Sequence, residues 1–160
     1  MITKSTARTT VWWSLTVLWA AVIFFFSSQD ATASSALSDQ VVEWLVAVFQ
    51  IDISVSAPAP DFSLTEIIRS FAHFSCFGIL GILTAAAVRS HHVREYRCLW
   101  IPFILCVGYA ITDEIHQWFV PGRSMQLSDV LVDSSGAAFG ILAVALIVLV
   151  VRNHKKRTAQ

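Results

Sequence analysis

Charged side chains that could bind or transform an anion are concentrated between residues 113 and 140, flanked by apolar runs at 98–112 and 136–151. They are Asp113, Glu114, Arg123, Asp129 and Asp133. A charged side chain near the centre of a bilayer costs about 2.5–3.5 kcal/mol on insertion scales, so an ionisable residue in a membrane segment is by default a functional one. These charges therefore indicate a site.

A second group of polar residues precedes this stretch. Glu66, Arg69 and His73 follow one another at spacings of three and four, which places them on one face of a helix. Counting at 1.5 Å per residue puts Arg69, His73, Asp113 and Asp133 roughly 20–30 Å from the basic flanks of their segments. In a hydrocarbon core about 30 Å thick, these residues form one layer near the outer surface.

Binding and structural interpretations of this layer both remain open. Arg69 and Arg123 suit planar, bidentate capture of phosphate or carboxylate. Alternatively, an ion pair of Arg69 with Asp113 or Asp133 could fix the register of the helices. The predicted ligand-binding residues are Arg69, His73, Asp113, Glu114, Gln117, Arg123, Asp129 and Asp133.

Catalysis is a further interpretation, because His73, Asp113 and Glu114 could act as an acid and a base. A metal could in principle be held by His73, Asp113, Glu114, His116 and Asp133. No H-E-x-x-H or similar local spacing supports a metal site, so none is predicted. The sequence also indicates no cofactor and no nucleic-acid partner, and it leaves a homo-oligomer open.

Composition identifies the class of protein that must position these residues. With 56% hydrophobic and 14% charged residues in 160, the chain is too apolar for an ordinary soluble domain, and it is expected to form a single transmembrane domain over residues 1–160. Nine of the eleven Lys and Arg residues fall in three short segments, at 4–8, 89–97 and 152–157. Because cytoplasmic loops are rich in Lys and Arg, both termini are predicted to be cytoplasmic.

The expected fold is an all-α membrane protein, a four-transmembrane-helix bundle with spans at about 10–28, 64–88, 100–119 and 129–151. The first span could instead be a signal peptide cleaved near Ala33, but its length favours a retained helix. The third span is expected to begin near Pro102 and to end at Pro121. Ser128 or Asp129 is expected to cap the fourth.

Residues 30–63 carry five acids and no Lys or Arg, which favours the outer side. Within them a short amphipathic helix is predicted from apolar residues at helical spacing. Its stripe could lie on the membrane surface or pack on the bundle. The stripe consists of Leu37, Val41, Val42, Leu45, Val46 and Phe49, and Pro58 and Pro60 follow in an extended connector.

Small residues predict where helices approach closely. Gly136 and Gly140 lie on the same helical face as Asp133, and Gly78 and Gly81 lie in the second span. The cysteines show no CxxC or Cys/His spacing, so packing is their expected role. They are Cys76, Cys98 and Cys106.

Four motifs together resemble the VanZ-like family of small bacterial membrane proteins. They are Phe26-Ser27-Ser28-Gln29, Arg69-x-x-x-His73-Phe74, Asp113-Glu114-x-x-Gln117 with Phe119 and Pro121-Gly122-Arg123, and Asp129-x-x-x-Asp133-x-x-Gly136-x-x-x-Gly140. The resemblance covers nearly the whole chain. It departs at Asp133, where the family more often has Asn.

The resemblance implies a bacterial cytoplasmic membrane, a link to the cell envelope and an association with resistance to the glycopeptide teicoplanin. It implies neither a reaction nor a ligand. From the residues, the expected function is binding of an anionic lipid or lipid-linked envelope precursor in an outer-leaflet polar pocket. The alternatives are a membrane enzyme acting on a phosphorylated or acyl-D-Ala envelope substrate, and a structural or accessory subunit.

Overall fold

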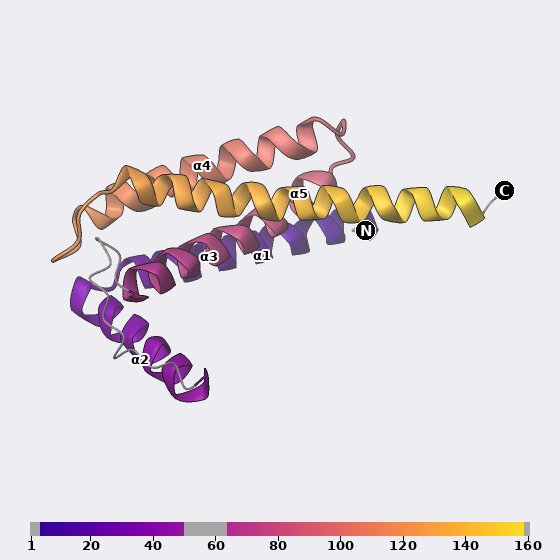
Figure 1. Ribbon diagram of the computed structural model, residues 1–160. Helices are drawn as coiled ribbons and strands as arrows, with labels where there is room; N and C mark the ends of the chain where they lie inside the picture. Colours follow the sequence, from indigo (N-terminus) through magenta and orange to yellow (C-terminus); the bar gives the residue numbers. More distant parts are fainter. Residues whose placement is uncertain (1–3, 50–63, 159–160) are drawn as a thin grey trace.

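The computed structural model describes residues 4–49 and 64–158, and every regular element in these two ranges is an α-helix. This finding confirms the predicted all-α class. The helices, in chain order, are α1 (Lys4–Ser27), α2 (Ala31–Phe49), α3 (Leu64–Arg89), α4 (Arg97–Gln117) and α5 (Leu127–Thr158) (Figure 1).

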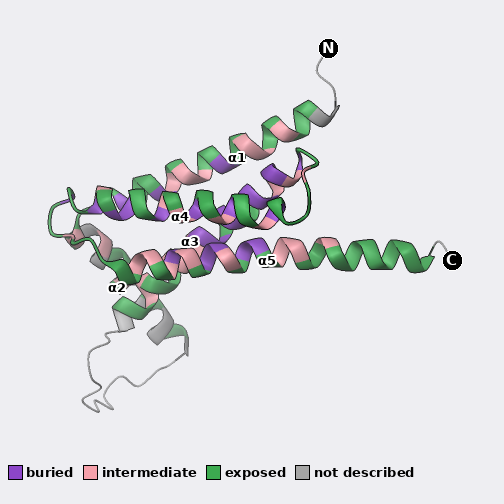
Figure 2. Ribbon diagram, turned by 90° about the horizontal axis from the view of Figure 1, so that it is seen from above, coloured by how far each residue is buried: buried purple, intermediate pink, exposed green. Residues whose placement is uncertain are grey.

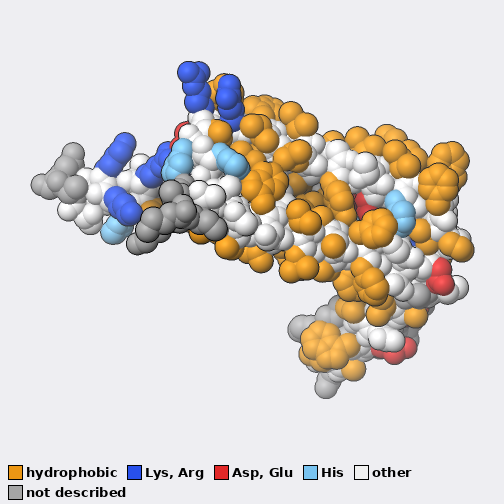
Figure 3. Space-filling model, turned by 180° about the vertical axis from the view of Figure 1, so that it is seen from behind, with side chains coloured by type: hydrophobic (Ala, Val, Ile, Leu, Met, Phe, Trp, Pro, Cys, Tyr) orange, Lys and Arg blue, Asp and Glu red, His pale blue; other side chains and the backbone are white. Residues whose placement is uncertain are grey.

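Four of these helices, α1, α3, α4 and α5, are long and apolar enough to cross a membrane. Large apolar side chains remain exposed along their outer faces, and a space-filling view shows them covering most of the length of the bundle (Figure 3). Such a surface is unfavourable in water and suits a lipid environment. The chain is therefore a multi-pass membrane protein, and the predicted four-helix membrane bundle is confirmed.

The three basic segments lie at one end of the bundle, which holds the start of α1, the α3–α4 turn and the end of α5 (Figures 1 and 3). Arg89 Nη1 donates to Glu95 Oε2 at 2.8 Å, and Arg152 also pairs with Glu95. Ser90 Oγ donates to Thr9 Oγ1 at 3.0 Å, which links α3 to α1. This basic end is thus held together by polar contacts between helices.

The closest helix contact is the seam between α3 and α5, where backbone meets backbone. A Cβ atom added to Gly140 would lie 2.0 Å from the carbonyl oxygen of Gly78, and one added to Gly136 would lie 2.1 Å from that of Phe74. No side chain fits at either position, so the predicted close approach at these glycines is confirmed. Buried residues follow the inner faces of α3, α4 and α5 (Figure 2).

Helix α1 is tied into this bundle by two side-chain bonds to backbone carbonyls. Trp19 Nε1 donates to the carbonyl of Cys76 at 2.9 Å, and Tyr109 Oη donates to that of Ala20 at 2.7 Å. These bonds hold α1 against α3 and α4. Ala33, the cleavage point of the alternative signal-peptide interpretation, lies in the first turn of α2.

The predicted amphipathic helix is present as α2, which packs against α3 and extends obliquely away from the bundle (Figure 1). Several features predicted near it fall outside the described residues. They are Asp52, Asp61, the connector prolines Pro58 and Pro60, and the side chains of Val42, Leu45, Val46 and Phe49.

Two helix starts differ from the prediction. Helix α4 begins at Arg97, so Pro102 lies more than one turn inside it and removes only the bond to the carbonyl of Cys98. Helix α5 begins at Leu127, which places both predicted caps, Ser128 and Asp129, within its first turn. Asp129 there carries a negative charge close to the positive end of the helix dipole.

Candidate functional site

A cavity of about 490 Å³ opens between α1, α2 and α3, away from the basic end. Most of its wall is apolar, which suits a hydrocarbon chain. The apolar wall consists of Ile23 and Phe26 of α1, Leu37, Val41 and Trp44 of α2, and Ile68, Ala72, Cys76 and Phe77 of α3. Helix α2 thus supplies one wall of the cavity, and its exposed stripe borders that space.

Charged residues gather at one part of the cavity wall. Arg69 and His73 of α3, Asp113 of α4 and Arg123 of the α4–α5 loop all line it. Among the described residues, neither Arg69 nor Arg123 has a carboxylate oxygen within 4.0 Å, and three buried N–H groups of these two side chains lack an acceptor. Buried polar groups are normally hydrogen-bonded, so these guanidinium groups are suited to an acceptor from outside the chain.

Arg123 is half-buried on the loop that follows Gly122. Burial lowers the pKa of Arg123, and the nearby Arg69 guanidinium lowers this pKa further, while the carboxyl groups of Asp113, Glu114 and Asp129 act in the opposite direction. An arginine nevertheless keeps its charge at neutral pH. Two positive charges therefore share one partly desolvated wall, and an anion placed there would relieve their repulsion.

The histidine of the site is oriented by a carboxylate of the neighbouring helix. His73 Nδ1 lies 3.2 Å from Oδ1 of Asp133, which is fully buried on α5. The alternative interpretation, an ion pair of Arg69 with Asp113 or Asp133, is wrong for the described residues, because neither aspartate lies within salt-bridge distance of Arg69. His73, one helical turn further along α3, contacts Asp133 instead.

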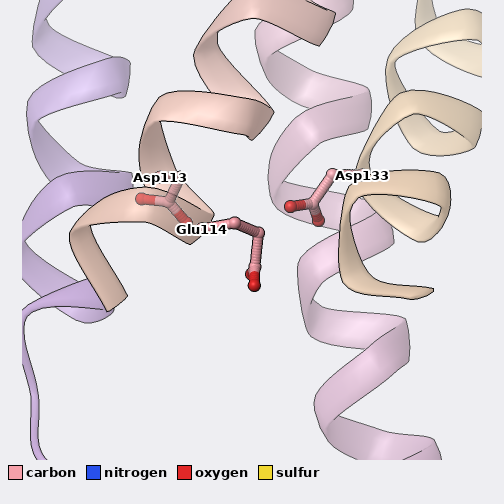
Figure 4. A group of neighbouring side chains, drawn as sticks. All are labelled: Asp113, Glu114 and Asp133. Carbon is pink, nitrogen blue, oxygen red and sulfur yellow. The ribbon is translucent and has the colours of Figure 1, made fainter. Parts of the chain in front are cut away.

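Three carboxylates meet where α4 faces α5. Asp113, Glu114 and Asp133 are buried and offer one oxygen each, all within 4.8 Å of one another. Glu114 of α4 and Asp133 of α5 both project into the space between the two helices (Figure 4). The backbone N–H of Gln126 donates to Glu114 Oε2 at 2.8 Å, and Gln117 Nε2 donates to Asp113 Oδ2 at 3.1 Å.

The structure places the remaining predicted residues around these groups. Gln117 supports Asp113 and does not line the cavity. Asp129 lies in the first turn of α5, where its Oδ1 accepts from Ser128 Oγ at 3.4 Å, and it belongs to neither the cavity wall nor the carboxylate group. His116 turns toward α1, with its ring centroid 4.5 Å from that of Phe24.

Two contributions to the site were missed by sequence reasoning. One is the wall from α2, above all Trp44, whose only signal was the amphipathic stripe that left two alternatives open. The other is the backbone N–H of Gln126, which carries no side-chain signal. Ser27 and Gln29, which belong to the motif after the first span, also line the cavity.

Comparison with known proteins gives one match. The VanZ/LLP1 family model matches residues 12–149, a range that contains every residue of the cavity wall and of the carboxylate group. No curated protein and no solved structure shows a significant match to the chain. Since the family model covers most of the 160 residues, the chain belongs to the VanZ/LLP1 family.

Proposed function

We propose that this protein binds an anionic lipid or lipid-linked envelope precursor, with the phosphate or carboxylate at Arg69 and Arg123 and the hydrocarbon in the cavity between α1, α2 and α3. The observation that carries the proposal is the pair of guanidinium groups without a described carboxylate within 4.0 Å, in a cavity whose wall is mostly apolar. A ligand that satisfies both parts must be amphiphilic.

The shape of the site supports this ligand class. The cavity volume of about 490 Å³ falls within the range of about 300–1,000 Å³ that is typical of small-molecule sites, so it holds a headgroup and a segment of chain. Arg side chains bind phosphate through two parallel N–H donors. Ser27 and Gln29 add neutral polar groups beside them.

The distribution of charge supports a ligand in the outer leaflet of a bacterial cytoplasmic membrane. Lys and Arg gather at the opposite end of the bundle, and basic ends face the cytoplasm. Reporter fusions at His91 and Gln160 should therefore read as cytoplasmic, and a fusion at Asp52 as external. An external reading at His91 would place the cavity in the inner leaflet.

Binding of an envelope precursor would connect the protein to the teicoplanin resistance that the family resemblance implies. The proposed contribution to resistance is capture of the anionic amphiphile. It is tested by measuring teicoplanin susceptibility of cells that carry Arg69→Ala at normal protein level. Unchanged teicoplanin resistance in that variant would show that resistance does not depend on binding in the cavity.

The direct test of binding uses the full chain in detergent and two short-chain lipids that differ only in headgroup, phosphatidate and phosphatidylcholine. The wild type should bind phosphatidate at least about tenfold more tightly, because only its phosphate is free to take up both guanidinium groups. Arg69→Ala should remove this preference. Arg94→Ala, an exposed arginine at the basic end, is the matched control and should retain it.

A second candidate function is supported by the bond between His73 and Asp133. A histidine oriented by a buried carboxylate is an arrangement used for acid–base catalysis, and His73 also lines the cavity. An enzyme would lose turnover in His73→Gln while keeping phosphatidate binding. A binding protein would show no turnover in the wild type.

A further inference from the structure

The carboxylate group of Asp113, Glu114 and Asp133 is poorly compensated for its burial. The exposed fractions of the three side chains are 3%, 0% and 0%. Among the described residues, hydrogen bonds supply this group with one ionisable partner, His73 on Asp133, and two neutral donors. Burying carboxylates without positive charge is strongly unfavourable, so this group requires a cation or protons.

A second observation points to a cation. Four buried oxygens of this region have no hydrogen-bond donor among the described residues, and they are Asp113 Oδ1, Glu114 Oε1, Asp133 Oδ2 and Gln117 Oε1. Gln117 is fully buried, and its amide lies against Asp113 because its Nε2 donates to that carboxylate. Its Oε1 is thus an additional neutral acceptor beside three acidic ones.

We propose that Asp113, Glu114 and Asp133, with the amide oxygen of Gln117, bind one divalent cation between α4 and α5. The spacing of up to 4.8 Å between carboxylate oxygens fits ligands on opposite sides of an ion at 2.0–2.6 Å from each. The donor set is all oxygen, which selects hard ions such as Mg²⁺, Ca²⁺ or Mn²⁺ over zinc or copper. His73 is outside the set because its Nδ1 faces Asp133.

The cation site adjoins the cavity through Asp113, which belongs to both. A bound divalent ion neutralises carboxylates that would otherwise repel an anion entering beside Arg69 and Arg123. The cation site itself does not depend on the proposed amphiphile, and it can be measured without one.

The experiment is an electron paramagnetic resonance titration of Mn²⁺ against the full chain, freed of metal with a chelator and reconstituted in phosphatidylcholine nanodiscs. We expect saturable binding of one Mn²⁺ per chain. Glu114→Gln and Asp133→Asn should each weaken binding at least about tenfold, because affinity follows the number of charged ligands. The control Glu43→Gln, which removes an exposed acid of α2, should bind like the wild type.

Thermal unfolding of the same samples distinguishes a variant that has lost the metal site from a variant that folds poorly. Mg²⁺ or Ca²⁺ should raise the unfolding temperature of the wild type and of Glu43→Gln, and should not raise that of Glu114→Gln. Without metal, Glu114→Gln should unfold at the same temperature as the wild type or higher, since one repelling carboxylate is gone. Absence of Mn²⁺ binding to the folded wild type, or equal binding by all variants, would overturn the proposal and assign protons to the carboxylates.

Discussion

The two ends of the bundle differ in whether their arginines form ion pairs with carboxylates. At the basic end, Glu95 is exposed and bridges Arg89 and Arg152. At the cavity end, Arg69 and Arg123 line one wall with no described carboxylate within 4.0 Å, while acidic groups lie buried close by on α4 and α5. Opposite charges are present at both ends, yet among the described residues only the basic end pairs its arginines with a carboxylate.

This difference separates charges that serve the fold from charges that serve a ligand. An exposed ion pair is worth about 0–1 kcal/mol, so the basic end could lose its pairs with little consequence. Buried unpaired charges destabilise a fold, and the proposed ligand and cation would compensate those at the cavity end. The contrast leads to four graded predictions.

The largest effect is expected at Arg123. Arg123→Ala should weaken phosphatidate binding about thirtyfold or more, because removing one partner of a desolvated charge pair costs about 2 kcal/mol or more of affinity. Arg123→Lys should recover only part of it, since lysine keeps the charge and loses the planar fork. Arg152→Ala, at the basic end, should bind like the wild type. Titration of all three variants with phosphatidate at matched protein level measures these affinities. Full binding by Arg123→Ala would show that the cavity end does not use its arginines for a ligand.

The next effect concerns the seam that connects the two ends. Gly140→Ala should destabilise the protein by about 1–3 kcal/mol, because its Cβ would meet the backbone of Gly78 and the helices would have to separate. Gly108→Ala is the matched control, with no atom within 4 Å of the added Cβ, and it should stabilise by up to about 1 kcal/mol. Denaturant unfolding in detergent compares the two. Equal stability would show that α3 and α5 are not held at this contact.

A smaller effect is expected for the one described ion pair at the cavity end. A double-mutant cycle of His73→Ala and Asp133→Asn should give a coupling free energy of about 1 kcal/mol, as contacting polar residues usually do. The same cycle on Arg69→Ala and Asp133→Asn should be close to additive. Strong coupling in the second cycle and none in the first would indicate an ion pair between Arg69 and Asp133 in place of the one between His73 and Asp133.

The smallest effect is expected at Glu95. The Arg89 hydrogen bond, followed by that of Arg152, lowers the pKa of Glu95. A carboxylate with a lowered folded-state pKa stabilises the protein above its ordinary pKa, and that contribution is lost as the pH falls through the lowered value. Glu95→Gln should therefore cost less than about 1 kcal/mol at pH 7 and nothing at low pH or high salt. A loss that persists in high salt would mean that Glu95 does more than pair at the surface.

The spanning helices and the common level of the polar residues could be predicted from the sequence, because both follow from distances along the chain. The apolar runs are long enough to span a membrane, and the rise per residue brought His73, Asp113 and Asp133 to one level. The glycine spacing likewise marked the α3–α5 seam at Gly136 and Gly140. These features need no knowledge of the partner helix.

The pairing within the layer could not be predicted in the same way, because it depends on how each helix is rotated and on chain segments distant in sequence. Arg69 and His73 share a face of α3, and the rotation of α5 brings Asp133 to His73. His116 adjoins the acidic residues in sequence, yet it turns toward Phe24. Pro102 indicated a helix start, but the packing of α4 extends that helix back to Arg97.

The central claim is that the cavity end holds an anionic amphiphile against Arg69 and Arg123. Native mass spectrometry of the protein, extracted gently from its own membrane, tests this claim without choosing a ligand in advance. The wild type should retain a phosphate- or carboxylate-bearing lipid or lipid-linked precursor, and the folded double variant Arg69→Ala with Arg123→Ala should lose that species. Retention of the same species by the double variant, or retention of zwitterionic lipids alone by the wild type, would contradict the account.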